Sequence, residues 1–156
     1  MNNLSNLLNA IKAKIETDRT EYRNNVHILH GEEQFFTIQN FLLPAAVIID
    51  AGSENEPQTK TNYYVWTHNV DILIYNSVSN IAKTVTGYGS AVGLITLCDN
   101  LMDTLKNHKF TGTVDGIISA RINTVYGTRP WIEITENGGT VGVKGFRIKY
   151  KEYYTE

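Results

Sequence analysis

The stretch Tyr63–Tyr75, which reads Tyr-Tyr-Val-Trp-Thr-His-Asn-Val-Asp-Ile-Leu-Ile-Tyr, decides the fold of this chain. Its residues alternate between two faces, and we expect the face that carries Val70, Ile72 and Ile74 to be buried. Such alternation, rich in β-branched and aromatic residues, is typical of a long strand. Because a free edge of this length would invite aggregation, we expect the strand to be central or completed by a neighbouring chain.

The opposite face of this strand is polar where it carries Thr67, Asn69 and Asp71. We expect these three side chains to meet solvent or another subunit. Asp71, like Asp50 before it, has no partner of opposite charge close to it in the sequence. Both are therefore interpreted as isolated carboxylates.

Two segments repeat their apolar residues at the spacing of an amphipathic helix. The first runs from about Asn3 to Arg19, and the second runs from about Ala91 to Asn107 with Ser90 as its N-cap. Each helix needs a surface to cover, and we expect that surface to be a sheet. Their apolar stripes consist of Leu4, Leu7, Leu8, Ile11 and Ile15, and of Leu94, Leu97, Cys98, Leu101, Met102 and Leu105.

Further strands are expected on both sides of the central one. Pro44–Asp50 is a continuous apolar run, which predicts a strand covered on both faces. The polar segment Ala51–Asn62 follows, and we expect a long loop that is mobile in the free subunit and orders on assembly. Asn137-Gly138-Gly139 predicts a hairpin, and Lys151–Glu156 predicts a polar tail. The remaining candidate strands are Val26–His30, Val114–Ser119, Ala120–Tyr126, Trp131–Glu136 and Val141–Tyr150.

This order of elements predicts one α+β domain over residues 1–156, with a mostly antiparallel sheet and two packed helices. The core should combine the helix stripes with strand residues that share one periodicity. The predicted core residues are Leu4, Leu8, Ile11, Ile15, Val47, Ile49, Val70, Ile72, Ile74, Leu94, Cys98, Leu101, Leu105, Phe146 and Ile148.

Composition limits the classes of protein that fit. The chain has 156 residues, 42% of them hydrophobic and 19% charged, as expected for one globular domain. Its formal net charge of -2 argues against a protein that wraps nucleic acid by general electrostatic attraction. With one cysteine it forms no intrachain disulfide, and we expect neither a signal peptide nor a membrane span.

Candidate catalytic and metal-binding groups lack the partners that such sites need. Gly87–Gly93 resembles a dinucleotide-binding loop, but its third glycine falls one residue late. His27 and His30 would point to opposite faces of a strand. Cys98 lies on a helix stripe and His68 on a strand face, where we expect both to be packed side chains. We therefore expect no catalytic site, no bound metal and no cofactor.

The whole pattern resembles the tail terminator, or tail completion, proteins of long-tailed bacteriophages. That family has an N-terminal helix, followed by a strand that opens with Leu-Pro, here Leu43–Ile49. A polar loop then leads to a long alternating strand, here Tyr64–Tyr75, and to a Leu-rich helix, here Leu94–Leu105. The chain closes on a hairpin whose last strand here reads Gly145-Phe146-Arg147-Ile148-Lys149-Tyr150. The resemblance covers most of the chain and lies in the order and pattern of its elements.

The resemblance implies a structural protein without catalysis. It would form a ring, usually a hexamer, that caps the tail tube and joins it to the head-side connector or stopper protein. DNA would pass through the lumen without specific binding, and the ring would belong to the tail or neck of the virion after assembly in the host cytoplasm. The alternatives are another head–tail joining or head-completion protein, and a small ligand-binding domain that uses the aromatic strand face. The predicted subunit-interface residues are Glu54, Glu56, Lys60, Thr67, Asn69 and Asp71.

Overall fold

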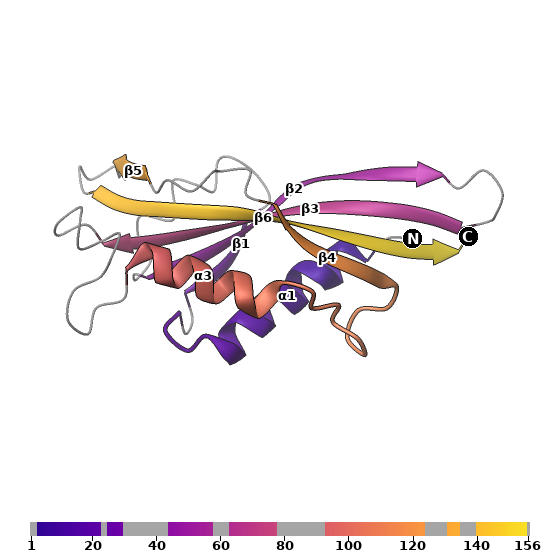
Figure 1. Cartoon of the computed structure of the whole chain (residues 1–156), viewed down its shortest axis with the longest axis horizontal. Coiled ribbons are helices and arrows are strands. Elements are labelled where there is room, and N and C mark those ends of the chain that lie inside the picture. Colours follow the sequence, from indigo (N-terminus) through magenta and orange to yellow (C-terminus); the bar gives the residue numbers. More distant parts are fainter. Residues whose placement is uncertain are drawn as a thin grey trace.

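The computed structural model describes residues 3–22, 25–29, 44–57, 63–77, 93–123, 131–134 and 140–155. These residues form an α+β fold, a mixed and mostly antiparallel sheet with two helices (Figure 1). The fold class predicted from the sequence is confirmed at this level. The elements are α1 (Leu4–Asp18), β1 (Val26–Leu29), β2 (Ala45–Pro57), β3 (Tyr63–Ser77), α3 (Leu94–Leu105), β4 (Ile117–Asn123), β5 (Trp131–Ile134) and β6 (Thr140–Thr155).

The predicted long strand, β3, lies in the middle of the sheet. The strand order is β1-β2-β3-β6-β4, and β5 pairs with the part of β6 that β4 does not reach. β3 and β6 pair antiparallel without interruption from Tyr63↔Thr155 to Ser77↔Val141. β2 lies antiparallel on the other side of β3, whereas β1 is parallel to β2. The prediction that this strand is central is therefore confirmed.

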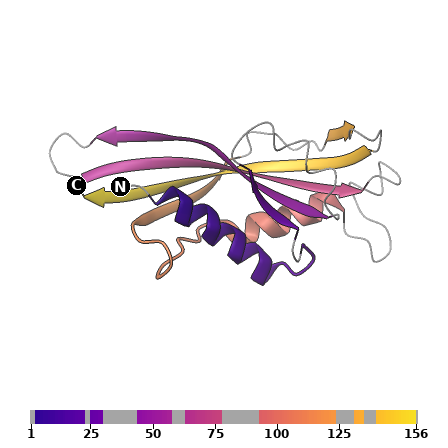
Figure 2. The same cartoon turned by 180° about the vertical axis from the view of Figure 1, so that it is seen from behind.

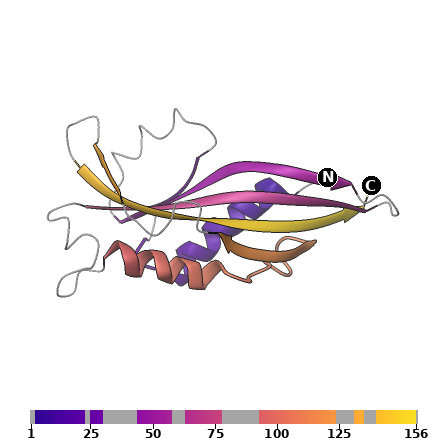
Figure 3. The ribbon, with the colours of Figure 1, turned by 45° about the horizontal axis from the view of Figure 1, so that its top comes forward.

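Both helices pack on the same face of the sheet (Figures 2 and 3). The apolar stripes of α1 and α3 meet the face of β3 that carries Val70, Ile72 and Ile74, and all three are fully buried. Phe146, Ile148 and Tyr150 of β6 continue this core beside them, since paired residues share a face. The face of β3 predicted to be buried is confirmed.

The face of the sheet that neither α1 nor α3 covers is called here the outer face, and Thr67, Asp71 and Leu73 of β3 lie on it. One part of it is also buried. Its apolar cluster consists of Leu29, Ala45, Val47, Leu73, Tyr75 and Val143, each no more than 4% exposed. Because Ala46 and Ile48 face the helices while Val47 faces the outer cluster, the strand predicted to be covered on both faces is confirmed.

The predicted core residues are buried with two exceptions. Leu4 at the start of α1 and Ile49 of β2 are only partly buried, although each packs against a buried cluster. Val47 belongs to the outer cluster, whereas the predicted core treated all these residues as one layer. The core therefore has two layers, separated by the sheet.

Two predictions about strand length are wrong. Residues 51–57, predicted as part of a long loop over 51–62, continue β2 and pair with β3 as far as Pro57↔Tyr64. Residues 151–155, predicted as a polar tail, continue β6 and pair with the first residues of β3. The ends of both segments extend beyond the helices, where burial no longer requires apolar side chains (Figure 1). Glu152, by contrast, lies at the N-terminal end of α1 and is fully buried.

Among the described residues 114–123, the structure has one strand where two were predicted, at 114–119 and 120–126. The described strand, β4, begins at Ile117, directly after Gly116. Gly116 has a φ of +87°, and a Cβ atom there would lie 2.5 Å from the carbonyl oxygen of Tyr153. Only glycine fits that approach, and the turn that it makes delays the strand. Val114 is buried, although it lies in a turn rather than in a strand.

The helices and the last hairpin follow their predictions more closely. α1 spans Leu4–Asp18 where 3–19 was expected, and α3 spans Leu94–Leu105 where 91–107 was expected, with Gly93 as its N-cap. β5 and β6 are antiparallel with Ile134 opposite Thr140, as a hairpin requires. The predicted cap Ser90, the 87–92 segment, His30 and the 137–139 turn lie outside the described residues.

Leu101→Ala should lower the free energy of unfolding by about 2–5 kcal/mol, because it leaves a cavity between α3 and the sheet. Leu101 is 0% exposed, whereas Ile95 on the same helix is 41% exposed, so Ile95→Ala is the matched control. We expect the control to change stability by less than about 0.5 kcal/mol. Chemical denaturation measures both, and equal losses would contradict the assignment of the buried side of α3.

Candidate functional site

A line of polar side chains crosses the helix-covered face of the sheet near the N-terminal end of α1. The Ser53 hydroxyl lies 2.7 Å from Nδ1 of His68, and Nε2 of His68 lies 2.7 Å from Oε2 of Glu152. His68 and Glu152 are both 0% exposed, whereas Ser53 is half-buried. Buried polar groups of this kind are stabilising only when they are hydrogen-bonded, and here each is.

Strand register brings these three side chains together. His68 lies in β3 opposite Ser53 of β2, and Glu152 lies in β6 opposite Trp66, one position along the same face. The ring of Trp66 is parallel to that of His68 within 6°, with the centroids 6.2 Å apart. Three neighbouring strands therefore contribute one polar group each, and an aromatic ring lies next to the imidazole.

A bulge in β2 is what places a hydroxyl opposite His68. The β2–β3 register shifts between Asp50 and Ser53, and Gly52 in the bulge has a φ of +102°. Its N–H donates to the Asp50 carboxylate at 3.0 Å. Without the extra residue, Gly52 would stand opposite His68 and no side chain would bond to Nδ1. Glycine suits the bulge because it adopts positive φ without strain.

Glu152 also completes the N-terminus of α1. The backbone N–H of Asn3 donates to both oxygens of the Glu152 carboxylate, at 3.0 and 3.2 Å. Asn3 is the N-cap residue, but its own side chain makes no capping hydrogen bond to the helix; it donates instead to the Asp115 carbonyl at 3.2 Å. A carboxylate at this position satisfies a main-chain donor and lies at the positive end of the helix dipole.

The chain of hydrogen bonds has the residue types of a hydrolytic triad, but not its arrangement. In a serine hydrolase the carboxylate binds Nδ1, and the exposed Nε2 serves the nucleophile. Here the carboxylate binds Nε2 and the serine binds Nδ1, and the whole ring is enclosed. If the imidazole is neutral, Nε2–H donates to Glu152 and Nδ1 accepts from Ser53. We interpret this arrangement as one that fixes three strands and a helix end.

A second polar pair lies on the outer face. Nε and the second guanidinium nitrogen of Arg147 donate to the two carboxylate oxygens of Asp71, at 2.6 and 3.1 Å. Asp71 is 4% exposed. The interpretation of Asp71 as an isolated carboxylate is therefore wrong: its partner is distant in the sequence but adjacent across the β3–β6 register.

The predicted interface residues divide into two groups. Glu54 and Glu56 are exposed side chains of β2, and Asn69 is half-buried with its amide donating to the Gly52 carbonyl. Thr67 and Asp71 are buried within the subunit, so of the two expected surroundings, solvent is wrong for these two residues, and contact with another subunit stays a prediction. Thr67 lies in register between the longer side chains of Glu54 and Lys151, which explains its burial. Lys60 lies outside the described residues.

The remaining candidate reactive or metal-binding side chains that the structure describes are packed residues without the surroundings of a catalytic or metal site. Burial raises the pKa of the Cys98 thiol to about 11, so the thiol stays protonated and unreactive at neutral pH. Burial, with a smaller effect from Lys12, lowers the pKa of His27, and burial raises that of Tyr150 on the helix side. Among the described residues, no three His, Cys, Asp or Glu side chains come close enough together to hold a metal ion.

Sequence reasoning missed the Ser53–His68–Glu152 chain. The available signal was His68, a polar residue on an otherwise apolar strand face. Its partners lie in segments predicted as loop and tail, so no register connected them to β3.

No known protein-family model matches this sequence, and a search of curated proteins also gives no match. Neither described helix combines the length and apolar character needed to cross a membrane.

Glu152→Gln should lower the free energy of unfolding by about 1.5–3 kcal/mol, because hydrogen bonds to a charged acceptor become weaker neutral ones. Ser53→Ala removes one neutral hydrogen bond at the half-buried end of the chain, so its effect should be smaller. Urea titration followed by tryptophan fluorescence measures both. Glu56→Gln, an exposed position on β2, is the matched control, and a loss there as large as in Glu152→Gln would refute the assigned role.

A serine-directed fluorophosphonate should leave Ser53 unlabelled in the folded protein, because both nitrogens of His68 are engaged and its ring is enclosed. Mass spectrometry of the intact protein gives the readout, with Ser53→Ala as the control. Labelling of the parent that is absent from Ser53→Ala would reveal an activated serine and overturn the non-catalytic interpretation.

Proposed function

We propose that this protein is a structural component of a long-tailed bacteriophage, a tail terminator. It forms a homo-oligomeric ring, a hexamer, that ends the growth of the tail tube. The ring contacts the tail tube protein on one side and the head-side connector or stopper on the other. DNA passes through its lumen without specific binding, and its place in the virion is the tail or neck.

The observation that carries this proposal is the extension of the sheet beyond its helices. β2, β3 and β6 continue past the end of the helical layer as a projecting ribbon of strands (Figures 1 and 3). The outer face is charged toward this end of the sheet, with Glu54 and Glu56 on β2 and Lys149 and Lys151 on β6 all exposed. A small domain rarely extends paired strands with so little apolar burial, and a neighbouring subunit supplies a reason for them.

The candidate site also supports a role in assembly. Its histidine and glutamate are enclosed and position β2, β3, β6 and α1, which agrees with a protein that acts through surface complementarity. A rigid frame of this kind suits a subunit that must present fixed surfaces to several neighbours. The element order, which resembles that of tail terminators, agrees with the same role.

Removing the gene from the phage that encodes it should give tails of uncontrolled length that do not join heads, as seen by electron microscopy of lysates. A plasmid copy of the parent gene should restore normal virions, which controls for effects on neighbouring genes. Tails of normal length that still attach to full heads would exclude the terminator role. Normal free tails beside unfinished heads would instead identify a head-completion protein.

A further inference from the structure

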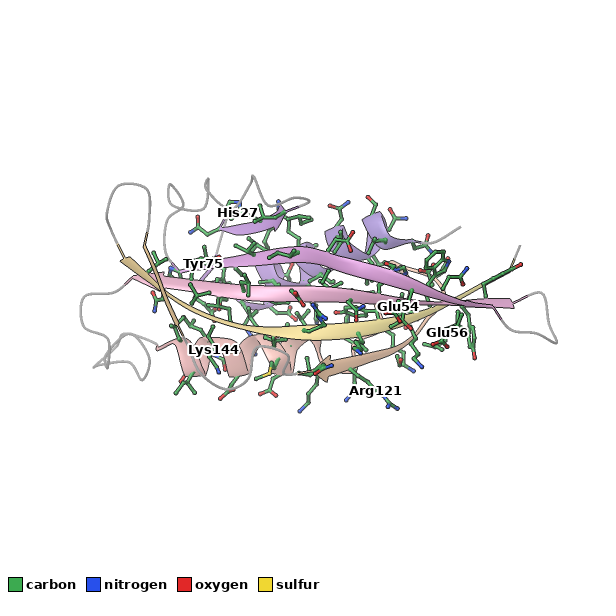
Figure 4. All side chains as sticks on the ribbon, turned by 90° about the horizontal axis from the view of Figure 1, so that it is seen from above. His27, Glu54, Glu56, Tyr75, Arg121 and Lys144 are labelled. Carbon is green, nitrogen blue, oxygen red and sulfur yellow. The ribbon has the colours of Figure 1, made fainter. Side chains whose placement is uncertain are left out.

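The outer face of the sheet is divided by charge. Exposed carboxylates lie on its β2 side, at Glu54 and Glu56. The other side of the outer face is formed by β6 and β4. All charged side chains described there are cations: Arg121, Arg147, Lys149 and Lys151. Figure 4 shows the two glutamates toward one end of the sheet and Arg121 at the opposite border from β1. We call the first group the acidic border and the second the basic border.

The two borders lie at the same height along the strands. Ser119 of β4 is opposite Lys151 of β6, Lys151 is opposite Thr67 of β3, and Thr67 is opposite Glu54 of β2. These residues form one row across the sheet, with Ser119 and Glu54 at its two ends. Arg121 is the next outer-face residue of β4. Two copies placed side by side without stagger bring Glu54 next to the neighbour's Ser119 and within diagonal reach of its Arg121.

Main-chain pairing differs between the borders. Within the described residues, the side of β2 remote from β3 pairs only at residues 46–49, with β1, so no described strand lies beyond residues 50–57. On β4, the Ala120 carbonyl already accepts a hydrogen bond from the Asn107 N–H at 3.1 Å. Side-chain ion pairs, rather than an unbroken hydrogen-bonded ladder, therefore suit this contact.

We infer that the acidic border of one copy binds the basic border of the next, so that Glu54 and Glu56 meet the neighbour's Arg121 and Lys149. This inference rests on the proposed ring and names the surfaces that close it. The two borders are different surfaces in the two halves of one sheet, and on the basic side Arg121 lies on the edge strand β4 while Lys149 lies beside it on the adjacent strand β6. A contact between them is head-to-tail, which is the kind that generates cyclic rings.

The charge pattern also selects against other pairings. Two acidic borders brought together would place carboxylate against carboxylate, and two basic borders would place guanidinium and ammonium groups together. Like charges facing each other suppress a contact, whereas opposite charges favour it. The pattern therefore disfavours a two-fold dimer through either border. Because all of these charges except Arg147 are exposed, the contact should weaken as salt concentration rises.

Charge reversal tests the inference on the purified full-length chain. The double variant Glu54→Lys/Glu56→Lys should reduce self-association roughly tenfold or more, as measured by sedimentation velocity across a concentration series. Arg121→Glu/Lys149→Glu should do the same. An equimolar mixture of the two double variants should recover self-association in complexes that alternate the two chains, because both contacts between unlike variants pair opposite charges whereas every contact between like variants pairs like charges. The matched control is Asp99→Lys, an exposed charge in the first half of α3, which packs on the opposite face of the sheet; this variant should associate like the parent.

Cysteine cross-linking tests the direction of the contact. In a Cys98→Ala background, Glu54→Cys and Ser119→Cys chains, each confirmed as folded by circular dichroism, are mixed and treated with a short bis-maleimide. The expected product joins one chain of each kind. Products that join two Glu54→Cys chains would show a two-fold contact and overturn the inference. If neither mixed products nor products of two Glu54→Cys chains form, the inference is overturned as well.

These results separate the inference from the proposed function. Rings that form equally well in every charge variant would exclude these borders and leave the terminator role standing. Normal tails in a phage that lacks the protein would exclude the terminator role. The border contact would still stand if Glu54→Cys and Ser119→Cys chains cross-link to each other. DNA binding that is lost in Arg121→Glu/Lys149→Glu, in a chain that does not self-associate, would assign the basic border to nucleic acid instead and overturn the inference.

Discussion

The uninterrupted pairing of β3 with β6 is the constraint on which the rest of the structure depends. Both strands bury apolar residues on the helix-covered face, and over part of their length on the outer face as well, so only one register serves both. A slip by one residue would transfer the apolar residues of one strand to the opposite face. It would also separate His68 from Glu152 and Asp71 from Arg147. Apolar burial and polar pairing therefore specify the same alignment.

The two polar pairs act from opposite faces of these strands. His68 and Glu152 lie beneath the helix layer, whereas Asp71 and Arg147 lie on the outer face. A buried polar group that loses its partner costs more than the bond itself contributes, so each pair opposes any misaligned sheet. Apolar residues alone tolerate substitution much better. We attribute the length of the regular ladder to this combination.

The sequence predicted the parts of the fold that periodicity determines. The helix stripes, the buried face of β3 and the doubly covered start of β2 were all correct, because each has a local pattern of apolar residues. The polar ends of β2 and β6 were missed because strands that extend past the helices need no apolar alternation. The Ser53–His68–Glu152 chain was missed because Ser53 and Glu152 lie in the polar segments that were predicted as a loop and a tail, so no register related them to His68. Parallel pairing of β1 with β2 has no signal within either segment.

The bond between Asn3 and Glu152 joins residues 149 positions apart, and it bears on how the chain folds while it is being made. During translation, α1 leaves the ribosome long before β6, so the first turn of α1 waits for the carboxylate that completes it. β3 likewise has no strand on its β6 side until the last residues emerge. Contacts between such distant residues slow folding. A nascent chain that stops before β6 therefore exposes the central strand as an open edge, and chaperones are the cellular means of shielding it.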